Sequence, residues 1–166
     1  MDANLKLYES LKNSGIDPIL SLPCIMLKNL IQILEENNEI EHISITREEE
    51  GVGIAAGAYL AGRTPALLIQ NSGIGNSINA IKSLLELYEI PIIFIMSHRG
   101  DEGENIIAQI PMGQFTPQLL DSLPMRKIFI KSTNDIKKIK KNVEISKKTK
   151  KSLAILLKNT LWRELN

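Results

Sequence analysis

Cysteine, net charge and long apolar runs are what this sequence has least of, and each shortage excludes a class of protein. Cys24 is the only cysteine among 166 residues, which rules out an internal disulfide and a cysteine-cluster metal site. The formal net charge is +1, so no global attraction draws the chain to nucleic acid or to a membrane surface. No apolar run is as long as a membrane span, and the first ten residues lack the apolar core of a signal peptide. We therefore expect a soluble, cytoplasmic protein.

The rest of the composition is typical of a globular domain. Apolar residues make up 43% and charged residues 23% of the chain. The length suits one compact domain, which we predict over residues 1–166. No internal repeat or low-complexity linker divides it, and no His, Asp or Glu cluster has the spacing of a transition-metal site. We predict no metal site made by this chain alone.

Short β-rich apolar runs alternate with longer helical patterns along the whole chain. Near-continuous apolar runs such as PIIFIM are typical of strands covered on both faces. The predicted strands are Ile19–Leu22, His42–Thr46, Ala66–Gln70, Pro91–Met96, Lys127–Lys131 and Leu153–Leu157. The predicted helices are Asn4–Asn13, Met26–Glu36, Glu48–Ala61, Asn76–Tyr88, Pro117–Ser122 and Asp135–Ser146. The alternation predicts an α/β fold, with three α/β/α layers and a mostly parallel six-stranded sheet.

The unusual polar clusters fall where predicted strands end. The loops are SLPC (Ser21–Cys24), TREEEG (Thr46–Gly51), QNSGIGNS (Gln70–Ser77) and MSHRGDEGE (Met96–Glu104). In parallel sheets the ligand crevice lies beyond the carboxyl ends of the strands, so we expect these loops to meet there. Cys24 could approach a site in a neighbouring subunit, or it could be a small buried thiol.

In the stretch TREEEGVGIAAGAY, three glutamates lead into a run without any polar side chain before Tyr59. A helix that is apolar on every face is expected to be buried. A domain of this size rarely hides such a helix alone, so we expect a subunit interface. The glutamates could complement the helix dipole, with Thr46 as the N-cap. Alternatively, one glutamate enters the interface as a functional carboxyl.

The loop QNSGIGN follows a predicted strand and precedes a predicted helix. Its glycines permit a tight turn and close approach of the backbone to a ligand. The loop lacks both the GxGxxG spacing and the lysine of a P-loop. Taken alone, it is compatible with a ligand-binding loop and with an ordinary turn.

A basic segment near the C-terminus has two possible roles. Residues 126–151 hold 11 of the 20 basic residues, opposed only by Asp135 and Glu144. Such a segment could bind nucleic acid. Because Ile136, Ile139 and Val143 form an apolar stripe and the lysines fall largely off it, the pattern favours a solvated helix face. We therefore expect no nucleic-acid partner.

Four segments together resemble the pyrimidine-binding domain of thiamine-diphosphate-dependent decarboxylases. They are EEEGVGIAAGAYLAG, PALLIQNSGIGNSINAI, PIIFIMSHRG and GENIIAQIPMGQFTPQLLDSL, in the order and at the spacing of that family, from about Ser21 to Leu123. The first element is common to much of the superfamily, whereas the later ones are narrower. Within the family, the motifs are most similar to those of sulfopyruvate decarboxylases, with phosphonopyruvate decarboxylases next.

The resemblance implies roles for particular residues. In the family, one glutamate hydrogen-bonds N1′ of the aminopyrimidine, which favours its imino tautomer. The match falls on Glu48, and a one-residue slip would choose Glu49 instead. Asn71, Ser72 and Gly73 match a loop beside the cofactor.

Two further residues match a loop near the substrate. A sulfonate needs cationic or donor groups, which Arg99 and His98 can supply. Alternatively, Arg99 pairs with Asp101 or Glu102, and His98 has a backbone partner. Gln109 and Gln114 are weaker candidates for substrate contact.

The resemblance also implies the cofactors and partners. Superfamily members bind the diphosphate of thiamine diphosphate through Mg²⁺ on a Gly-Asp-Gly motif with a downstream asparagine. The nearest string here, RGDEG (Arg99–Gly103), has neither the spacing nor that asparagine. The resemblance therefore implies a separate beta subunit that holds Mg²⁺, an active site shared between subunits, and a hetero-oligomer with at least two alpha and two beta chains.

The implied reaction is the decarboxylation of 3-sulfopyruvate to sulfoacetaldehyde and CO₂, a step toward coenzyme M. Two alternatives remain open at this point. One is a phosphonopyruvate decarboxylase subunit, and the other is a non-catalytic binding module of the same fold.

Overall fold

The computed structural model describes residues 2–163, which form a six-stranded sheet in the order β2-β1-β3-β4-β6-β5. All neighbouring strands pair in parallel. The strands are β1 (Ile19–Ser21), β2 (His42–Ser44), β3 (Ala66–Gln70), β4 (Ile93–Ser97), β5 (Met125–Ile130) and β6 (Ser152–Leu157). The predicted α/β fold with a mostly parallel sheet is confirmed, and each predicted strand is present with ends shifted by at most two residues.

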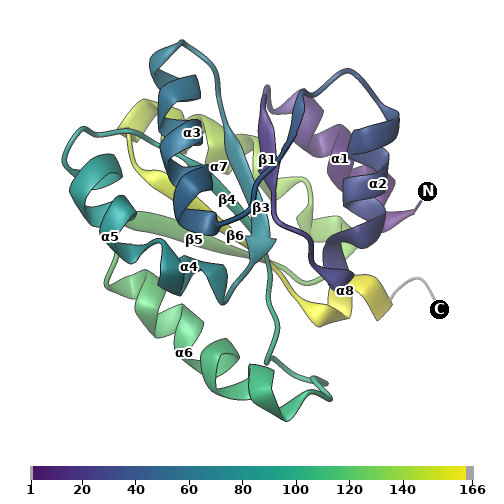
Figure 1. The fold of residues 1–166 in the computed structure, drawn as a ribbon. Helices are drawn as coiled ribbons and strands as arrows, with labels where there is room; N and C mark the ends of the chain where they lie inside the picture. Colours follow the sequence, from purple (N-terminus) through teal and green to yellow (C-terminus); the bar gives the residue numbers. More distant parts are fainter. Residues whose placement is uncertain (1, 164–166) are drawn as a thin grey trace.

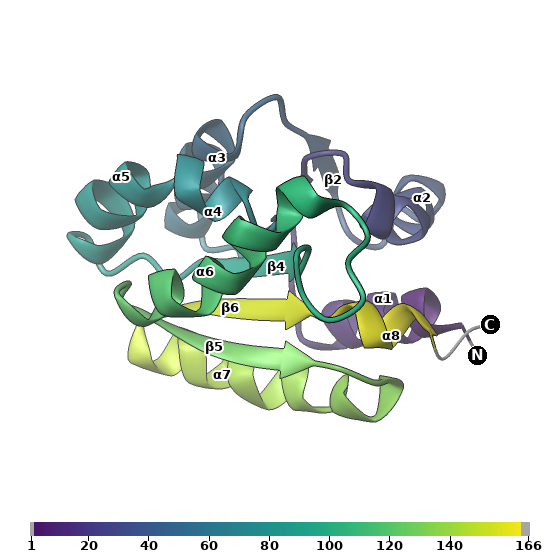
Figure 2. The ribbon, with the colours of Figure 1, turned by 90° about the horizontal axis from the view of Figure 1, so that it is seen from below.

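Helices cover both faces of the sheet (Figures 1 and 2). The α-helices are α1 (Ala3–Asn13), α2 (Lys28–Glu36), α3 (Glu48–Leu60), α4 (Gly73–Asn76), α5 (Ile78–Ala80), α6 (Ile110–Asp121), α7 (Lys138–Thr149) and α8 (Asn159–Arg163). Shorter or wider turns are η1 (Ile25–Leu27), η2 (Ile81–Glu86), η3 (Ile107–Gln109) and η4 (Thr133–Asp135). Among the residues described, no helix is long and apolar enough to cross a membrane.

Alternate residues of the central strands enter two separate apolar cores. Ala66 and Leu68 of β3 contact the layer of α1, α2, α7 and α8, whereas Leu67 and Ile69 contact the layer of α3, α4, η2 and α6. This two-residue period follows from the pleat of a strand. Both faces are covered, which is why β3 and β4 read as continuous apolar runs.

The basic helix α7 has the amphipathic pattern that the sequence predicts. Ile139 and Val143 are fully buried, whereas the lysines of α7 are exposed. Long charged side chains therefore form the solvated face of this helix in the described chain.

Three sequence predictions about helices need correction. The helix predicted over Pro117–Ser122 begins already at Ile110, and the helix predicted over Asn76–Tyr88 is divided into α4, α5 and η2. Helix α8 was not predicted at all. Pro111 is tolerated near the start of α6 because the first helical N–H groups have no partner within the helix.

Helix α3 is only half-buried, contrary to the expectation from its apolar sequence. Val52 and Ala55 are fully buried against the sheet, but Ile54 is 40% and Leu60 is 75% exposed. Gly57 also lies on the exposed side. The described chain therefore leaves one apolar face of this helix uncovered.

Candidate active site

The polar loops predicted from the sequence meet at the carboxyl edge of the sheet. Cys24 follows β1, Glu48 follows β2, Asn71 follows β3 and His98 follows β4, and these strands are parallel neighbours. Parallel topology brings their ends to one side, as predicted. The same edge is overhung by α6, which lies beside α4 in Figure 2.

The three consecutive glutamates of α3 have three different surroundings. The carboxylate of Glu50 accepts hydrogen bonds from the backbone N of Thr46 at 3.0 Å and from its Oγ1 at 2.8 Å. These bonds hold the pKa of Glu50 below its usual value. Glu49 is exposed, whereas Glu48 is half-buried. Thr46 is not the N-cap, because the helix begins one residue later and Arg47 occupies that position.

Glu48 lies directly against the loop that follows β3. A Cβ atom added to Gly73 would lie 2.5 Å from both Cγ and Oε1 of Glu48, so any other residue there would displace the glutamate side chain. Asn76 donates a hydrogen bond from Nδ2 to Oε2 of Glu48, at 3.1 Å. This hydrogen bond orients the carboxylate toward the loop, and Oε1 has no hydrogen-bond partner among the described residues.

Asn71 holds the same loop to two neighbouring segments. Its side chain is 1% exposed, accepts a hydrogen bond from the backbone N of Arg99 at 2.9 Å and donates to Oγ1 of Thr116 at 2.9 Å. A second, longer bond runs from Nδ2 to the carbonyl of Arg99, at 3.3 Å. The predicted site residue Asn71 therefore fixes the loop that carries Ser72 and Gly73.

A chain of polar side chains crosses the strand ends beside this loop. Nε2 of Gln70 donates to Oγ of Ser72 at 2.7 Å and to Oε1 of Gln109 at 3.0 Å. Sγ of Cys24 lies 3.2 Å from Oγ of Ser97. Cys24 is half-buried in this network. Ser97 and Gln70 lie in two of the loops quoted from the sequence, but neither was named there as a site residue.

His98 is buried beneath α6. Its side chain is 2% exposed, and its Nε2 lies 2.9 Å from the carbonyl oxygen of Gly113. Nδ1 is buried without a hydrogen-bond partner, and the ring stacks on Phe129 at 6.4 Å between centroids. Burial lowers the pKa of His98 below the ordinary value of 6.5.

Arg99 forms a buried ion pair that the sequence did not predict. Its Nε and Nη2 donate to Glu104 at 2.6 and 2.8 Å, and the two side chains are 8% and 5% exposed. The expected partner Asp101 instead pairs with Lys158 at 2.6 Å. The Arg99 hydrogen bonds, together with those from the N–H groups of Gly100 and Ile106, lower the pKa of Glu104 to about 2.

A cavity of about 400 Å³ adjoins this ion pair at the carboxyl edge. It is lined by Met26, Arg99, Gly103, Glu104, Asn105, Ile106, Asn159 and Trp162. Nε and Nη2 of Arg99 donate to Glu104. The third nitrogen, Nη1, has no hydrogen-bond partner among the described residues. This edge therefore offers a guanidinium group beside a cavity with amide side chains and apolar walls.

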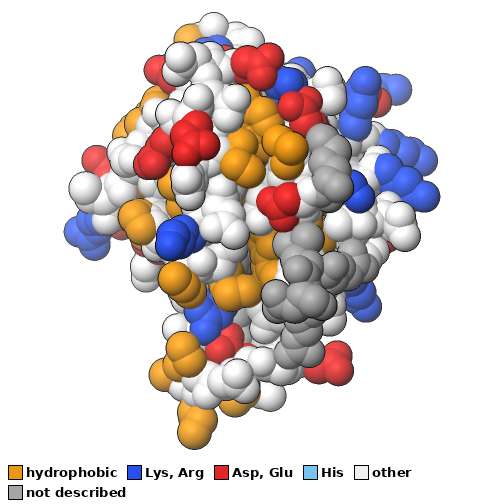
Figure 3. All heavy atoms as spheres, turned by 90° about the vertical axis from the view of Figure 1, so that its right-hand side faces the viewer, with side chains coloured by type: hydrophobic (Ala, Val, Ile, Leu, Met, Phe, Trp, Pro, Cys, Tyr) orange, Lys and Arg blue, Asp and Glu red, His pale blue; other side chains and the backbone are white. Residues whose placement is uncertain are grey.

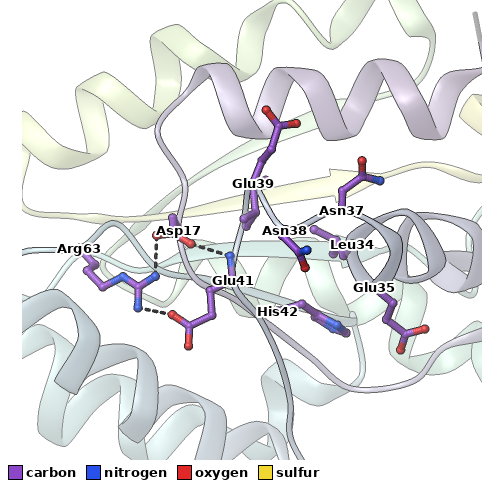
Figure 4. Close-up of a pocket in the computed structure, with 10 residues that line it drawn as sticks. Asp17, Leu34, Glu35, Asn37, Asn38, Glu39, Glu41, His42 and Arg63 are labelled. Carbon is purple, nitrogen blue, oxygen red and sulfur yellow. Dashed lines mark hydrogen bonds and ion pairs between the residues drawn. The ribbon is translucent and has the colours of Figure 1, made fainter.

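A second cavity, of about 640 Å³, lies at the opposite edge of the sheet (Figure 4). Arg63 crosses one side of it and pairs with Asp17 at 2.5 Å and with Glu41. Asp17 precedes β1 and His42 begins β2, so this cavity is at the amino ends of the strands. None of the residues predicted to bind a ligand lines it.

The described residues contain no cluster of three or more His, Cys, Asp or Glu side chains that could hold a metal ion. The candidate site is therefore a carboxylate and a glycine loop, supported by amide and hydroxyl groups. A family model named "Thiamine pyrophosphate enzyme, N-terminal TPP binding domain" matches residues 1–125. The chain belongs to this family. The family resemblance predicted from the motifs is thereby confirmed.

Decarboxylases of two kinds are similar in sequence to this chain. The chain is 47% identical over 163 residues to sulfopyruvate decarboxylase subunit alpha of Methanococcus maripaludis, and the match covers 98% of each chain. It is 35% identical over 130 residues to phosphonopyruvate decarboxylase of Streptomyces viridochromogenes, where it covers 78% of this chain and 33% of the relative.

A solved structure supports the fold of this family member. Thiamine diphosphate-dependent 4-hydroxybenzoylformate decarboxylase of Rhodococcus jostii superimposes with a TM-score of 0.74 over 99% of this chain and 31% of its own. The sequence identity is 13%, so this likeness concerns the fold alone.

Proposed function

We propose that the chain is the alpha subunit of a sulfopyruvate decarboxylase, which converts 3-sulfopyruvate to sulfoacetaldehyde and CO₂. The observation that carries the proposal is the 47% identity to a protein of that name over 98% of both chains. The phosphonopyruvate decarboxylase relative is more distant, at 35% identity. The site adds support, because the carboxylate and loop expected for this chemistry lie in contact.

The residues at the carboxyl edge fit the aminopyrimidine of thiamine diphosphate. Oε1 of Glu48 is without a hydrogen-bond partner among the described residues, and the absence of a side chain at Gly73 leaves the carboxylate in this place. We propose that Glu48 hydrogen-bonds N1′ of the ring, with the backbone of Asn71, Ser72 and Gly73 alongside. When bound, the cofactor supplies the electron sink for loss of CO₂ from a 2-keto acid. In this arrangement Glu48 holds the proton at N1′. The buried side chains of Val52 and Ala55, on the same face of α3, place apolar surface beneath the carboxylate of Glu48.

We propose that a beta subunit supplies the diphosphate and Mg²⁺ site. The sequence has no Gly-Asp-Gly motif with a downstream asparagine. The chain corresponds to only 33% of the phosphonopyruvate decarboxylase chain that it resembles, so that relative contains much additional sequence. The uncovered apolar face of α3, the helix that Glu48 begins, offers a surface for such a partner. An assembly with at least two alpha and two beta chains is consistent with a site shared between subunits.

We propose that Arg99 contacts the sulfonate end of the substrate. Its guanidinium lines the 400 Å³ cavity, and Nη1 has no hydrogen-bond partner among the described residues. A planar guanidinium suits an oxyanion, and Glu104 fixes its orientation. The family resemblance also predicts that His98 lies near the substrate. The burial of the His98 side chain points instead to a structural role.

The test is to co-purify the chain with a partner that carries Gly-Asp-Gly and to measure CO₂ release with thiamine diphosphate and Mg²⁺. Wild type, Glu48→Gln and Glu49→Gln are compared on sulfopyruvate and on phosphonopyruvate. We expect turnover of sulfopyruvate and a loss of about 100-fold or more in Glu48→Gln. Loss in Glu49→Gln alone would transfer the role to Glu49. If the complex turns over only phosphonopyruvate, then phosphonopyruvate and not sulfopyruvate is the substrate. Unchanged function in Glu48→Gln would favour a non-catalytic binding module.

A further inference from the structure

Helix α6 contains a carbonyl group that its own backbone cannot satisfy. Pro117 lies inside the helix and has no N–H, so it cannot donate to the carbonyl of Gly113, four residues earlier. A buried carbonyl without a donor is unfavourable. Nε2 of His98 lies 2.9 Å from that oxygen. Because a carbonyl only accepts, Nε2 carries the proton, and the imidazole takes the place of the missing helical donor.

The same contact removes His98 from any direct encounter with a substrate. The side chain is 2% exposed, and the ring lies between α6 and Phe129 of β5. Its backbone N–H donates to the carbonyl of Leu157 at 2.9 Å, which ties the residue to the end of β6. Nδ1 is buried and unpartnered. A ligand could reach this ring only after α6 had moved.

Helix α6 in turn holds the loop beside Glu48. Gly113 lies so close to the Arg99–Gly100 backbone that a Cβ atom would be 2.3 Å from the carbonyl oxygen of Arg99. One turn later, Oγ1 of Thr116 accepts the hydrogen bond from Asn71. Asn71 begins the loop whose Gly73 contacts Glu48. The position of α6 therefore affects the position of the proposed catalytic carboxylate through two contacts, that of Thr116 with Asn71 and that of Gly73 with Glu48.

We propose that His98 is a positioning residue, which fixes α6 by donating a hydrogen bond from Nε2–H to the carbonyl that Pro117 leaves free, and so holds the Asn71–Gly73 loop in place beside Glu48. The effect on turnover rests on the proposed function, whereas the hydrogen bond and its contribution to folding do not. This role accounts for a histidine at position 98 together with a proline at position 117.

The first experiment is a double-mutant cycle in the complex with the beta subunit. His98→Leu removes the donor, His98→Gln keeps an amide N–H near Nε2, and Pro117→Ala gives α6 its own N–H. We expect His98→Leu to lower kcat by about tenfold or more through misplacement of the site. We expect His98→Gln to recover most of that loss. His98→Leu with Pro117→Ala should lose less than His98→Leu alone, because the helical N–H then serves Gly113.

The second experiment needs no activity. Nitrogen and carbon NMR of the histidine rings in the full chain should show His98 as the neutral tautomer protonated at Nε2 at pH 7. The chain has two histidines, so His42→Gln assigns both signals. Unfolding of the same four variants should show the same coupling between positions 98 and 117.

Particular results would overturn the proposal. They are a charged His98 or an Nδ1-protonated tautomer at pH 7, or independent effects of the changes at 98 and 117 on unfolding. A His98→Gln variant as inactive as His98→Leu, with normal unfolding, would make His98 a direct participant instead. If the wild-type complex has no decarboxylase activity, the proposed function fails, while the NMR and unfolding results still decide the role of His98.

Discussion

Glu104 shows how much a single carboxylate can organise. It accepts two hydrogen bonds from Arg99 and three from the backbone N–H groups of Gly100, Asn105 and Ile106. The side chain is 5% exposed. One residue therefore shapes the loop after β4 and neutralises a buried guanidinium. The motif GENIIAQIPMG contains Glu104, but the sequence did not predict its pairing with Arg99, which lies five residues away across an irregular turn.

We predict that Glu104→Gln destabilises the chain by about 3 kcal/mol at pH 7, since it leaves Arg99 buried without a counter-charge. The pKa of Glu104 is about 2 in the fold, below its ordinary value of 4.5. Its contribution is therefore present above pH 4.5 and is lost as the pH falls toward 2. Urea unfolding at several pH values should show the difference between wild type and variant shrinking over that range. Glu102→Gln, at an exposed position, is the control.

His98, like Glu104, should make the chain less stable as the pH falls, but it should do so at a higher pH than Glu104. Burial lowers its pKa in the fold, the hydrogen bond to Gly113 and the charge of Asp101 oppose this, and the charge of Lys158 reinforces it. Because the folded pKa is below the unfolded value of 6.5, stability is lost as the pH falls below 6.5. His98→Gln should flatten this part of the profile. An equally steep profile in the variant would place the titration elsewhere, and His42→Gln tests the other histidine.

At the scale of elements, the contact between α3 and α4 depends on the absence of a side chain. Gly73→Ala would place a methyl group 2.5 Å from Cγ and Oε1 of Glu48. We predict that it displaces the carboxylate and lowers kcat by about tenfold or more in the complex. Gly57→Ala on α3 meets nothing within 4 Å, and it should stabilise the isolated chain by up to about 1 kcal/mol. Activity assays and thermal unfolding of both variants separate the two effects.

The central strands could be predicted because both of their faces are buried, so that apolar runs such as ALLI admit few other structures. Helix α6 was predicted only over its second half, since Gly113 and Pro117 oppose helix formation locally and are compensated by tertiary contacts. The carboxyl edge and the positions of the site residues on it follow from parallel topology. The partners of Arg99 and His98 do not, because they depend on the path of the 100–113 segment.

At the scale of the whole molecule, two regions of exposed apolar surface are candidates for interfaces. One is the open face of α3, with Ile54 and Leu60. The other is the end of the molecule that carries η3 and α6, where Ile107 is 81% and Phe115 is 50% exposed. Figure 3 shows hydrophobic side chains gathered at the lower end, which is where α6 lies in Figure 1. Exposed apolar patches of this kind mark interaction surfaces.

We predict that Ile54→Glu prevents association with the beta subunit but leaves the isolated chain folded. The reason is that a charge on the open face of α3 is solvated in the free chain and desolvated in an interface. Size-exclusion chromatography of the mixed subunits, with circular dichroism of the chain alone, measures both effects. Lys147→Glu on the solvated face of α7 is the matched control. Normal assembly of Ile54→Glu would exclude this face as the interface.

The close approach of Gly100 and Gly113 has a consequence for protein engineering. A Cβ atom on Gly113 would lie 2.4 Å from Cα of Gly100, so the two backbones are in contact and the residues between them form a closed loop. Both ends of that loop are fixed by the fold, and Glu102 near its start is exposed. Doubling the length of a closed loop costs only about 0.6 kcal/mol of closure entropy. The position after Glu102 is therefore suited to insertion of a reporter peptide, whose signal would report on whatever approaches the carboxyl edge.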